Sequence, residues 1–381
     1  MFGHGDPEIT APIRIFNTTP LSPSSTEFRH DCVSIISPCY NVERFIGRFF
    51  DSLVGQSYKQ LEVILVNDGS TDGTGELIRV SVPRLEAEGY IVKMVEQENR
   101  GLAGAIDAGL KHFTGEFLTW PDPDDWLTLD SIERRVELMR RFPDAGLLRT
   151  ACRLYLDERG EFGGDLGRVG GDPVVLDDLF SRLFLGRTHY HPVCYFARSS
   201  PFLASTGRSI HVAEGGNSQN LQMLLPLTER FPTIEVGEIC ANYTVRADSR
   251  SHRDVTPGPK VKRIMMLLDN LLQTIPKLAG NHNEYRRVAE QAWLRNRLLI
   301  TAFEGNLVSD GEAALGRSGL SAVRRLLARA ILHGKARFFP SSNHLTPEGG
   351  SAPYATRAFR KVVRFDPDSV SLPLPSTRVD I

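Results

Sequence analysis

The chain has 381 residues, of which 41% are hydrophobic and 24% charged, and a formal net charge of −1. This length suffices for one large domain and a smaller second one, and the balanced charge gives no reason to expect nucleic-acid binding. The five cysteines are scattered and form no Cys-x-x-Cys pair, which argues against a disulfide framework and a zinc site and is typical of a reducing cytosol. Neither a signal-peptide core nor a run of about 18 apolar residues is present, so we expect a cytoplasmic protein.

The first half of the chain alternates between short apolar runs and segments of helical periodicity. Residues 1–30 have no such pattern and are predicted to form an N-terminal arm. The alternation that follows predicts βαβ units, and hence an α/β fold with a Rossmann-like, mostly parallel sheet flanked by helices. The predicted strands are 33–36, 61–66, 91–95, 115–119 and 146–155, and the predicted helices are 43–56, a segment ending near 88, 102–112 and 131–141.

The second half follows a different pattern. Residues 156–210 are irregular and Gly-rich over 160–171, and the pattern becomes helical from Pro257 onward. We therefore predict an α/β domain over 31–255, a helical C-terminal region over 256–340, and a tail over 341–381 whose Pro, Ser and Arg content is typical of poor order. The apolar faces within 264–272 and 294–303 are expected to be buried core.

The segment from Arg246 to Arg364 is rich in Lys and Arg, although the net charge of the chain is near zero. A basic surface of this kind can meet acidic lipid, anionic glycan or another subunit. The alternative is a set of ordinary solvated helix faces. The C-terminal region is therefore a candidate for packing on the α/β domain, for homo-oligomer contact, or for peripheral contact with the inner face of a membrane.

Three carboxylates, Asp122, Asp124 and Asp125, lie within four residues directly after the predicted strand 115–119. Adjacent like charges raise one another's pKa, and a divalent cation removes that cost. Magnesium and manganese prefer carboxylate oxygen, and a metal held this way usually also holds a substrate phosphate. The cluster predicts a metal-assisted phosphate or nucleotide site, and the alternative is a solvated acidic turn.

Two further polar segments, Pro38 to Asn41 and Asn67 to Ser70, also follow predicted strands. Ligands of parallel sheets bind beyond the carboxyl ends of the strands, so the three segments are expected to form one composite site. Tyr40 and Asp68 belong to these two segments. The alternative for Asp68 is ordinary turn chemistry, which Asn-Asp-Gly-Ser also fits.

Four motifs together resemble the family 2 glycosyltransferases of the GT-A fold in order and spacing. They are the opening strand with its Tyr-Asn turn at 33–41, the nucleobase-binding segment at 62–72, the Asn-x-Gly turn at 99–103, and the strand with its DxD motif at 115–127. The resemblance covers about residues 31–250. It implies an inverting, Mn²⁺- or Mg²⁺-dependent transfer of a sugar from a nucleotide diphosphate donor, commonly a UDP-sugar, to a glycan or glycoconjugate acceptor. Surface polysaccharide biosynthesis is the expected setting.

The resemblance also implies roles for individual residues. Asp124 would bind the metal through the diphosphate, Asp122 would lie near the ribose and the metal, and Asp125 would orient the donor sugar or cap the next helix. Some enzymes of this fold add a late histidine to the metal, and His252 is the candidate here. The implied nucleotide-sugar contacts are Pro38, Tyr40, Asn41, Asp68, Asn99, Arg100 and Asp122.

The chain departs from the family where the general base is expected. An inverting transfer needs a base for the acceptor hydroxyl, usually an acidic residue in a Glu-Asp pair. This chain has Gln219-Asn220 there, and amides cannot act as bases. Glu214 is the nearest carboxylate and the candidate base, with a plain loop residue as the alternative. Gln219, Asn220 and Gln222 are candidates for contacts with sugar hydroxyls.

A second departure concerns Ile106-Asp107, where family members often carry Arg-Asn. Any contact made by that arginine must come from elsewhere, and Arg100 and Arg246 are the candidates. His191, which precedes Pro192, is either structural or acceptor-binding.

Two other functions remain open at this point. The amides at 219 and 220 also fit a non-catalytic nucleotide-sugar-binding or scaffold protein on a glycosyltransferase fold. A nucleotidyltransferase would share the acidic site, but it normally has an early Gly-rich, Lys- or Arg-bearing phosphate loop. Nothing between Pro38 and Arg48 has that form.

Overall fold

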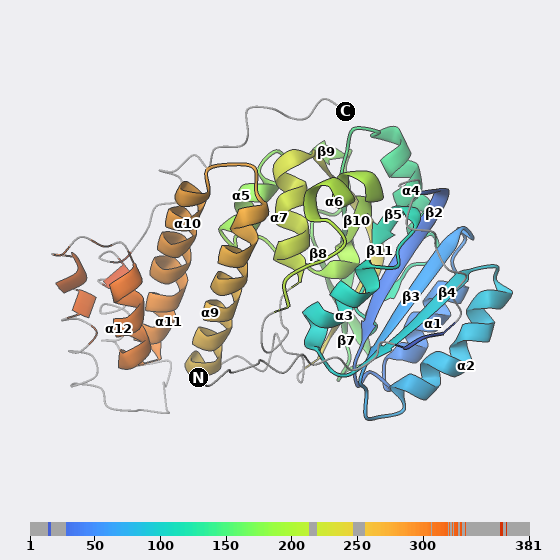
Figure 1. Cartoon of the computed structure of the whole chain (residues 1–381), viewed down its shortest axis with the longest axis horizontal. Helices are drawn as coiled ribbons and strands as arrows, with labels where there is room; N and C mark the ends of the chain where they lie inside the picture. The colour runs from blue at the N-terminus through green and yellow to red at the C-terminus, as the bar shows by residue number, and fades with distance from the viewer. Residues whose placement is uncertain are drawn as a thin grey trace, which may run out of the picture.

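The computed structural model describes residues 14–16, 28–212, 219–246, 256–305 and 307–318, together with isolated residues between 320 and 332 and between 359 and 363. Its centre is a sheet with the strand order β1-β4-β3-β2-β5-β10-β7-β11-β6, and β8 and β9 pair with β7 and β11 (Figure 1). The strands are β1 Arg14–Phe16, β2 Arg29–Cys39, β3 Leu61–Asp68, β4 Ile91–Gln97, β5 Gly115–Thr119, β6 Trp126–Leu127, β7 Leu147–Leu156, β8 Glu161–Leu166, β9 Val174–Val175, β10 Tyr195–Arg198 and β11 Thr233–Val245.

The first half of the sheet is parallel, as the apolar runs predict. β4, β3, β2 and β5 are parallel neighbours, and every residue of β3 is buried. Helical crossovers carry the chain from β2 through β3 to β4 and then back to β5, which lies on the other side of β2 from β3. The crossover helices are α1 Ile46–Val54, α2 Thr74–Ala87 and α3 Gly101–Leu110, and α4 Ser131–Arg141 follows the acidic turn.

The prediction of an irregular segment over 156–210 was wrong. This segment contains β8, β9, helices α5 Leu179–Phe184 and α6 Ser199–Thr206, and strand β10. β10 lies in the middle of the sheet, antiparallel to both β5 and β7. A four-residue buried strand has no periodicity of its own, and its burial comes entirely from neighbours distant in sequence. The longest strand, β11, was also not predicted.

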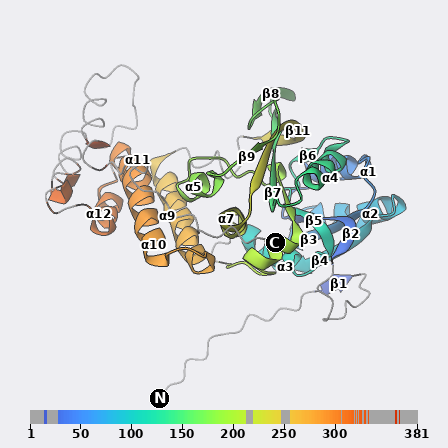
Figure 2. The ribbon, with the colours of Figure 1, turned by 90° about the horizontal axis from the view of Figure 1, so that it is seen from above.

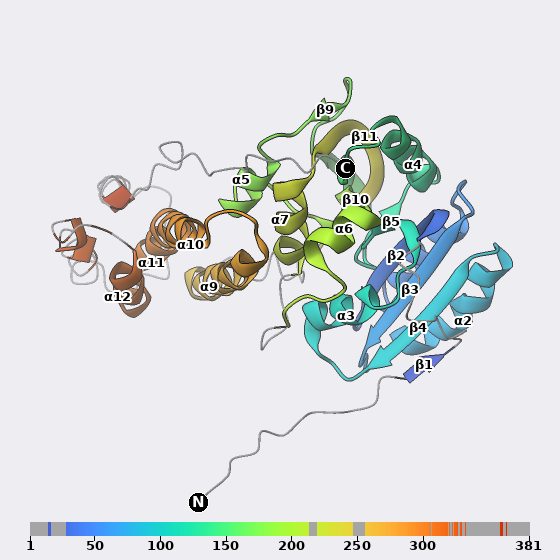
Figure 3. The same ribbon diagram turned by 45° about the horizontal axis from the view of Figure 1, so that its top comes forward.

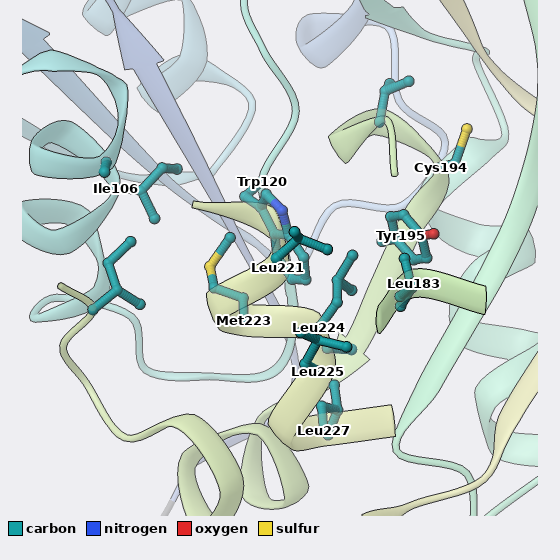
Figure 4. Packing of buried hydrophobic residues seen from close by; sticks show 14 of the residues in the cluster. Ile106, Trp120, Leu183, Cys194, Tyr195, Leu221, Met223, Leu224, Leu225 and Leu227 are labelled. Carbon is teal, nitrogen blue, oxygen red and sulfur yellow. The ribbon is translucent and has the colours of Figure 1, made fainter. Parts of the chain in front are cut away.

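Helix α7 Asn220–Arg230 forms the centre of the second half. Its residues Leu221, Leu224 and Leu225 are fully buried, and the helix lies near Trp120 and Tyr195 of the sheet side (Figure 4). The C-terminal helices lie against the opposite side of α7, away from the sheet (Figures 2 and 3). They are α9 Pro257–Thr274, α10 His282–Glu290, the π-helix η3 Gln291–Leu298, α11 Leu299–Glu304 and α12 Val308–Arg317.

Polar anchors fix this contact. The indole of Trp293 donates to the carbonyl of Phe184 at 2.8 Å, and the hydroxyl of Tyr285 donates to Glu229 at 2.8 Å. The apolar faces of α9 and of the helices after it belong to the same buried cluster as the sheet. Among the described residues, no helix has the length and apolar character needed to cross a membrane.

Candidate functional site

The ends of β2 and β3 are joined by a set of short hydrogen bonds. Asn41, with φ of 50°, donates its backbone N–H to Ser70 Oγ at 3.2 Å and accepts from the Thr71 N–H at 2.9 Å through its side chain. The amide of Asn41 therefore holds the two loops together. The ring of Tyr40 next to it is 39% exposed and remains accessible to a ligand. Pro38 lies inside β2, one residue before that strand ends.

Asp68 ends β3 with a buried carboxylate. Its Oδ1 accepts from Gln97 Nε2 at 2.6 Å and from the Arg100 N–H at 2.8 Å, which connects β3 to the loop after β4. Burial raises the pKa of Asp68, although the Arg100 and Gln97 hydrogen bonds act in the opposite direction. The side chain of Asn99 accepts from the Gly101 N–H at 3.0 Å and so holds the first turn of α3.

The acidic turn lies on the same edge, directly after β5. The Asp125 N–H donates to the Asp122 carbonyl at 3.1 Å, which closes the turn. Thr244 of β11 makes two hydrogen bonds to the turn. Its N–H donates to Asp125 Oδ1 at 2.8 Å, and its hydroxyl donates to the Asp124 carbonyl. The carboxylate of Asp124 pairs with the Arg246 guanidinium at 2.9 Å.

Asp125 is 1% exposed, and its Oδ2 has no hydrogen-bond partner among the described residues. Burial raises its pKa well above the usual range, and the charges of Asp124 and Asp122 raise it further. The alternative role as a helix cap was wrong, because the N-cap of α4 is Asp130. Asp125 instead fixes the end of β11 beside the acidic turn.

The acidic turn fits a divalent cation. Asp122 and Asp124 are partly exposed, whereas Asp125 is buried behind them with an unpartnered oxygen. A cation at Asp122 and Asp124 would relieve the repulsion among the three carboxylates. A separate group, His30, Asp31 and Glu116, has ligand atoms within 4.8 Å of one another.

That group lies at the amino-terminal ends of β2 and β5, on the opposite edge of the sheet. Its acidic members already have arginine partners, since Asp31 pairs with Arg140 and Glu116 with Arg198. Asp124 of the acidic turn is paired with Arg246 in the same way, so position distinguishes the two groups: the acidic turn follows the carboxyl end of β5, the edge at which ligands of parallel sheets bind.

The amides of α7 bond mainly to protein groups. Asn220 accepts from the Trp120 indole at 3.1 Å and donates to the Tyr190 carbonyl at 3.0 Å. Gln222 bonds to both backbone groups of His211, at 2.8 Å and 2.9 Å. Gln219 is buried at the N-cap of the same helix. In this structure the amides of Asn220 and Gln222 therefore join segments of the fold.

Glu214 and His252 lie outside the described residues, and their predicted roles remain predictions. The chain just before residue 213 is anchored by Asp107, which accepts from Ser209 Oγ at 2.7 Å and from the Ile210 N–H at 3.0 Å. Burial opposes ionisation of Asp107, but these bonds and Lys111 outweigh it and lower its pKa. At this departure from Arg-Asn, Asp107 thus anchors residues 209 and 210.

His191 lies beside β11, with its ring 4.2 Å from that of Tyr243 and 5.5 Å from that of His189. Burial and the charges of Arg149 and Arg263 lower the pKa of His191 to about 4. Burial and Arg149 also lower the pKa of His189 to about 3. Both imidazoles are therefore neutral at pH 7. The sequence pattern had no signal for Tyr243 or Thr244, because β11 itself was not predicted. Arg149 lies in the predicted strand 146–155, but its contact with His189 joins segments that are 40 residues apart.

Residues 34–155 match the family described as glycosyl transferase family 2. This segment contains the Tyr40, Asp68 and Asp122–Asp125 loops described above. The match to this family therefore covers the part of the chain that holds the candidate site.

Curated relatives are named as glycosyltransferases. "Glycosyltransferase GlyA" of Streptococcus pneumoniae is 38% identical over 103 residues, which are 27% of this chain and 14% of that protein. "Uncharacterized glycosyltransferase EpsJ" of Bacillus subtilis is 38% identical over 105 residues, 28% of this chain and 29% of that protein. The chain thus spans less than a third of the length of these two relatives.

Solved structures extend the likeness to most of the chain. The S. aureus TarS 1–349 structure in complex with UDP-GlcNAc has a TM-score of 0.55 and 17% identity, over 87% of this chain and 90% of that one. A second structure of S. aureus TarS 1–349 gives a TM-score of 0.56 at 16% identity. At this identity the likeness shows a shared fold, which is the GT-A α/β architecture.

Proposed function

We propose that this chain transfers a sugar, with inversion, from a nucleotide diphosphate donor to a glycan or glycoconjugate acceptor, with Mn²⁺ or Mg²⁺ bound at Asp122 and Asp124. One observation carries the proposal. The buried Asp68 carboxylate, the exposed Tyr40 ring and the acidic turn all lie at the carboxyl ends of the parallel strands β3, β2 and β5. This arrangement offers a base acceptor, a stacking face and a diphosphate-metal site in a row.

Different residues of the chain bind the nucleobase of the donor and hold the binding loops in place. Asp68 is held by Gln97 and the Arg100 N–H, so its carboxylate is fixed in place to accept an imide hydrogen bond from uracil. Tyr40 stacks on the base, and the Asn41 bonds to Ser70 and Thr71 hold the two loops in register. The bound ion supplies Lewis-acid stabilisation of the leaving nucleotide diphosphate.

Glu214 is our proposed base for the acceptor hydroxyl. Asp125 is buried and bonded to Thr244, so it contributes by holding β11 against the acidic turn. His191 is neutral, but a pKa of about 4 makes it a weak base at pH 7. Glu214 is therefore the carboxylate that we propose as the general base.

UDP-sugars are the first donors to test, because the chain shares its fold with a protein crystallised with UDP-GlcNAc. Surface polysaccharide or glycoconjugate assembly is the proposed setting, and the basic C-terminal helices are the proposed contact with a membrane surface or a second copy.

The test is release of the nucleoside diphosphate from a panel of UDP-, dTDP- and GDP-sugars with Mn²⁺ and mixed glycan acceptors. Asp124→Asn should lower turnover by at least ~10²-fold, because the leaving diphosphate loses its cation. The matched control is Asp130→Asn, which removes an exposed carboxylate from the same segment and should retain turnover. Full activity of Asp124→Asn would refute the metal assignment. Nucleotide binding without turnover in any mixture would favour the binding-only function.

A further inference from the structure

The guanidinium of Arg246 occupies the position where a cation at the acidic turn would be expected. Its Nη2 lies 2.9 Å from Asp124 Oδ2, and the two side chains are only 21% and 18% exposed. Arg246 directly follows β11, whose residue Thr244 is bonded to both Asp124 and Asp125. The backbone two residues before Arg246 is therefore bonded to the same turn that carries the Asp124 carboxylate.

The other side of this guanidinium is covered by an aromatic ring. The Arg246 guanidinium carbon lies 4.7 Å from the centre of the Phe45 ring, which is 4% exposed and follows the Tyr40-Asn41 turn by four residues. Arg44 lies over the same ring at 5.1 Å, but its own carboxylate partner is Asp157. Arg246 thus sits between the base-binding side of the site and the metal-binding turn.

We propose that Arg246 holds Asp124 when the site is empty and transfers to the diphosphate of the donor when donor and metal bind together. The inference rests on the proposed function and names the coupling of its two ligands. A guanidinium and a divalent ion compete for the same carboxylate oxygen, so the metal alone must first break the pair. A diphosphate replaces Asp124 as the partner of the Arg246 guanidinium, because its oxygens accept the planar guanidinium in a bidentate manner.

The consequence is cooperative loading of the site. Metal without nucleotide binds weakly, because it must displace Arg246 from Asp124. Metal with nucleotide binds well, because the displaced guanidinium then pairs with the diphosphate. Arg246 acts here as a positioning residue for the leaving group.

The first arm of the test measures metal affinity without nucleotide, by Mn²⁺ titration of the full-length protein with electron paramagnetic resonance. Arg246→Gln should bind Mn²⁺ about three- to fivefold more tightly than the wild type, since partly exposed ion pairs are worth up to about 1 kcal/mol. Arg44→Gln removes the arginine on the same Phe45 ring without touching Asp124, so its Mn²⁺ affinity should equal that of the wild type. Unchanged or weaker Mn²⁺ binding by Arg246→Gln would overturn the proposal.

The second arm measures UDP affinity at saturating Mn²⁺ by calorimetry. Arg246→Gln should lose about tenfold or more in UDP affinity, because a charge-assisted contact to the diphosphate is gone. Arg246→Lys keeps the charge but lacks the planar fork, so its Mn²⁺ affinity should stay near the wild type while its UDP affinity falls. If Arg246→Gln fails to fold, Arg246→Lys decides, and wild-type UDP affinity in that variant overturns the transfer to the diphosphate.

The two proposals fail in different ways. Absence of UDP binding by the wild-type protein with Mn²⁺ would count against the proposed function, while the metal arm would still decide whether Arg246 competes for Asp124. Tighter UDP binding by Arg246→Gln would overturn the inference and leave the donor site intact.

Discussion

The two halves of the sheet carry different parts of the site and are built in different ways. In β2, β3, β4 and β5, each parallel strand ends in its own polar loop, and the loops meet because carboxyl ends of parallel strands share an edge. In the second half, β10 enters antiparallel between β5 and β7, and the site is completed by contacts between distant segments. Thr244 and Asp125, for example, are 119 residues apart in the chain.

The loops after β2, β3 and β4 lie on neighbouring strands and are joined by bonds such as Asp68 to the Arg100 N–H, which are 32 residues apart. These loops should be sensitive to backbone changes that push neighbouring loops apart. The second half of the sheet depends on bonds between more distant segments and should be sensitive to loss of single buried polar side chains. The following predictions test that difference, from the largest expected effect to the smallest.

Gly69→Ala should have the largest effect on the donor side. Gly69 has φ of +67°, and an added Cβ would lie 2.7 Å from the backbone nitrogen of Asn99, so the loops after β3 and β4 would have to separate. We expect a loss of about 3 kcal/mol in the free energy of unfolding or a displaced Asp68 with weakened UDP binding. Thermal melts and UDP calorimetry measure both.

Gly89→Ala is the matched control, because Gly89 also has positive φ, +85°, but nothing lies within 4 Å of the added Cβ. It should show only the backbone cost, about 1 kcal/mol. Equal losses in the two variants would mean that the close approach to Asn99 is unimportant.

Asn220→Ala tests the long-range half. It removes the acceptor of the buried Trp120 indole and the donor to the Tyr190 carbonyl, and so should cost about 2 kcal/mol of stability. Denaturant unfolding measures this loss, and Asn283→Ala, at an exposed asparagine of α10, provides the control. A variant Asn220→Ala as stable as the control would show that these two bonds contribute little to stability.

The pH dependence of stability should show a smaller effect from the histidine pair. Burial lowers the pKa of His191 from its ordinary value of 6.5 to about 4 in the folded chain, so between these values the unfolded chain binds a proton that the folded chain does not. Stability contributed by the neutral ring is complete above pH 6.5 and is lost as the pH falls toward 4. His191→Gln should therefore reduce the decline in the free energy of unfolding between pH 6.5 and 5 by about 1 kcal/mol. Denaturant unfolding at a series of pH values measures this decline. An unchanged slope would contradict the lowered pKa.

The sequence by itself determined the α/β class, the parallel half of the sheet and the placing of Tyr40, Asp68 and the acidic turn at strand ends. It could do so because periodicity and turn chemistry are local, and because parallel topology brings strand ends to one edge. The C-terminal helices and their buried faces followed from helical periodicity in the same way.

Only the tertiary structure decided the rest. β10 and β11 owe their place to neighbours far along the chain, so no local pattern marked them. The amides of Asn220 and Gln222 bond to protein groups, which their sequence context left open. The pairing of Arg246 with Asp124 likewise joins two segments through space, because Thr244 fixes the end of β11 beside the acidic turn.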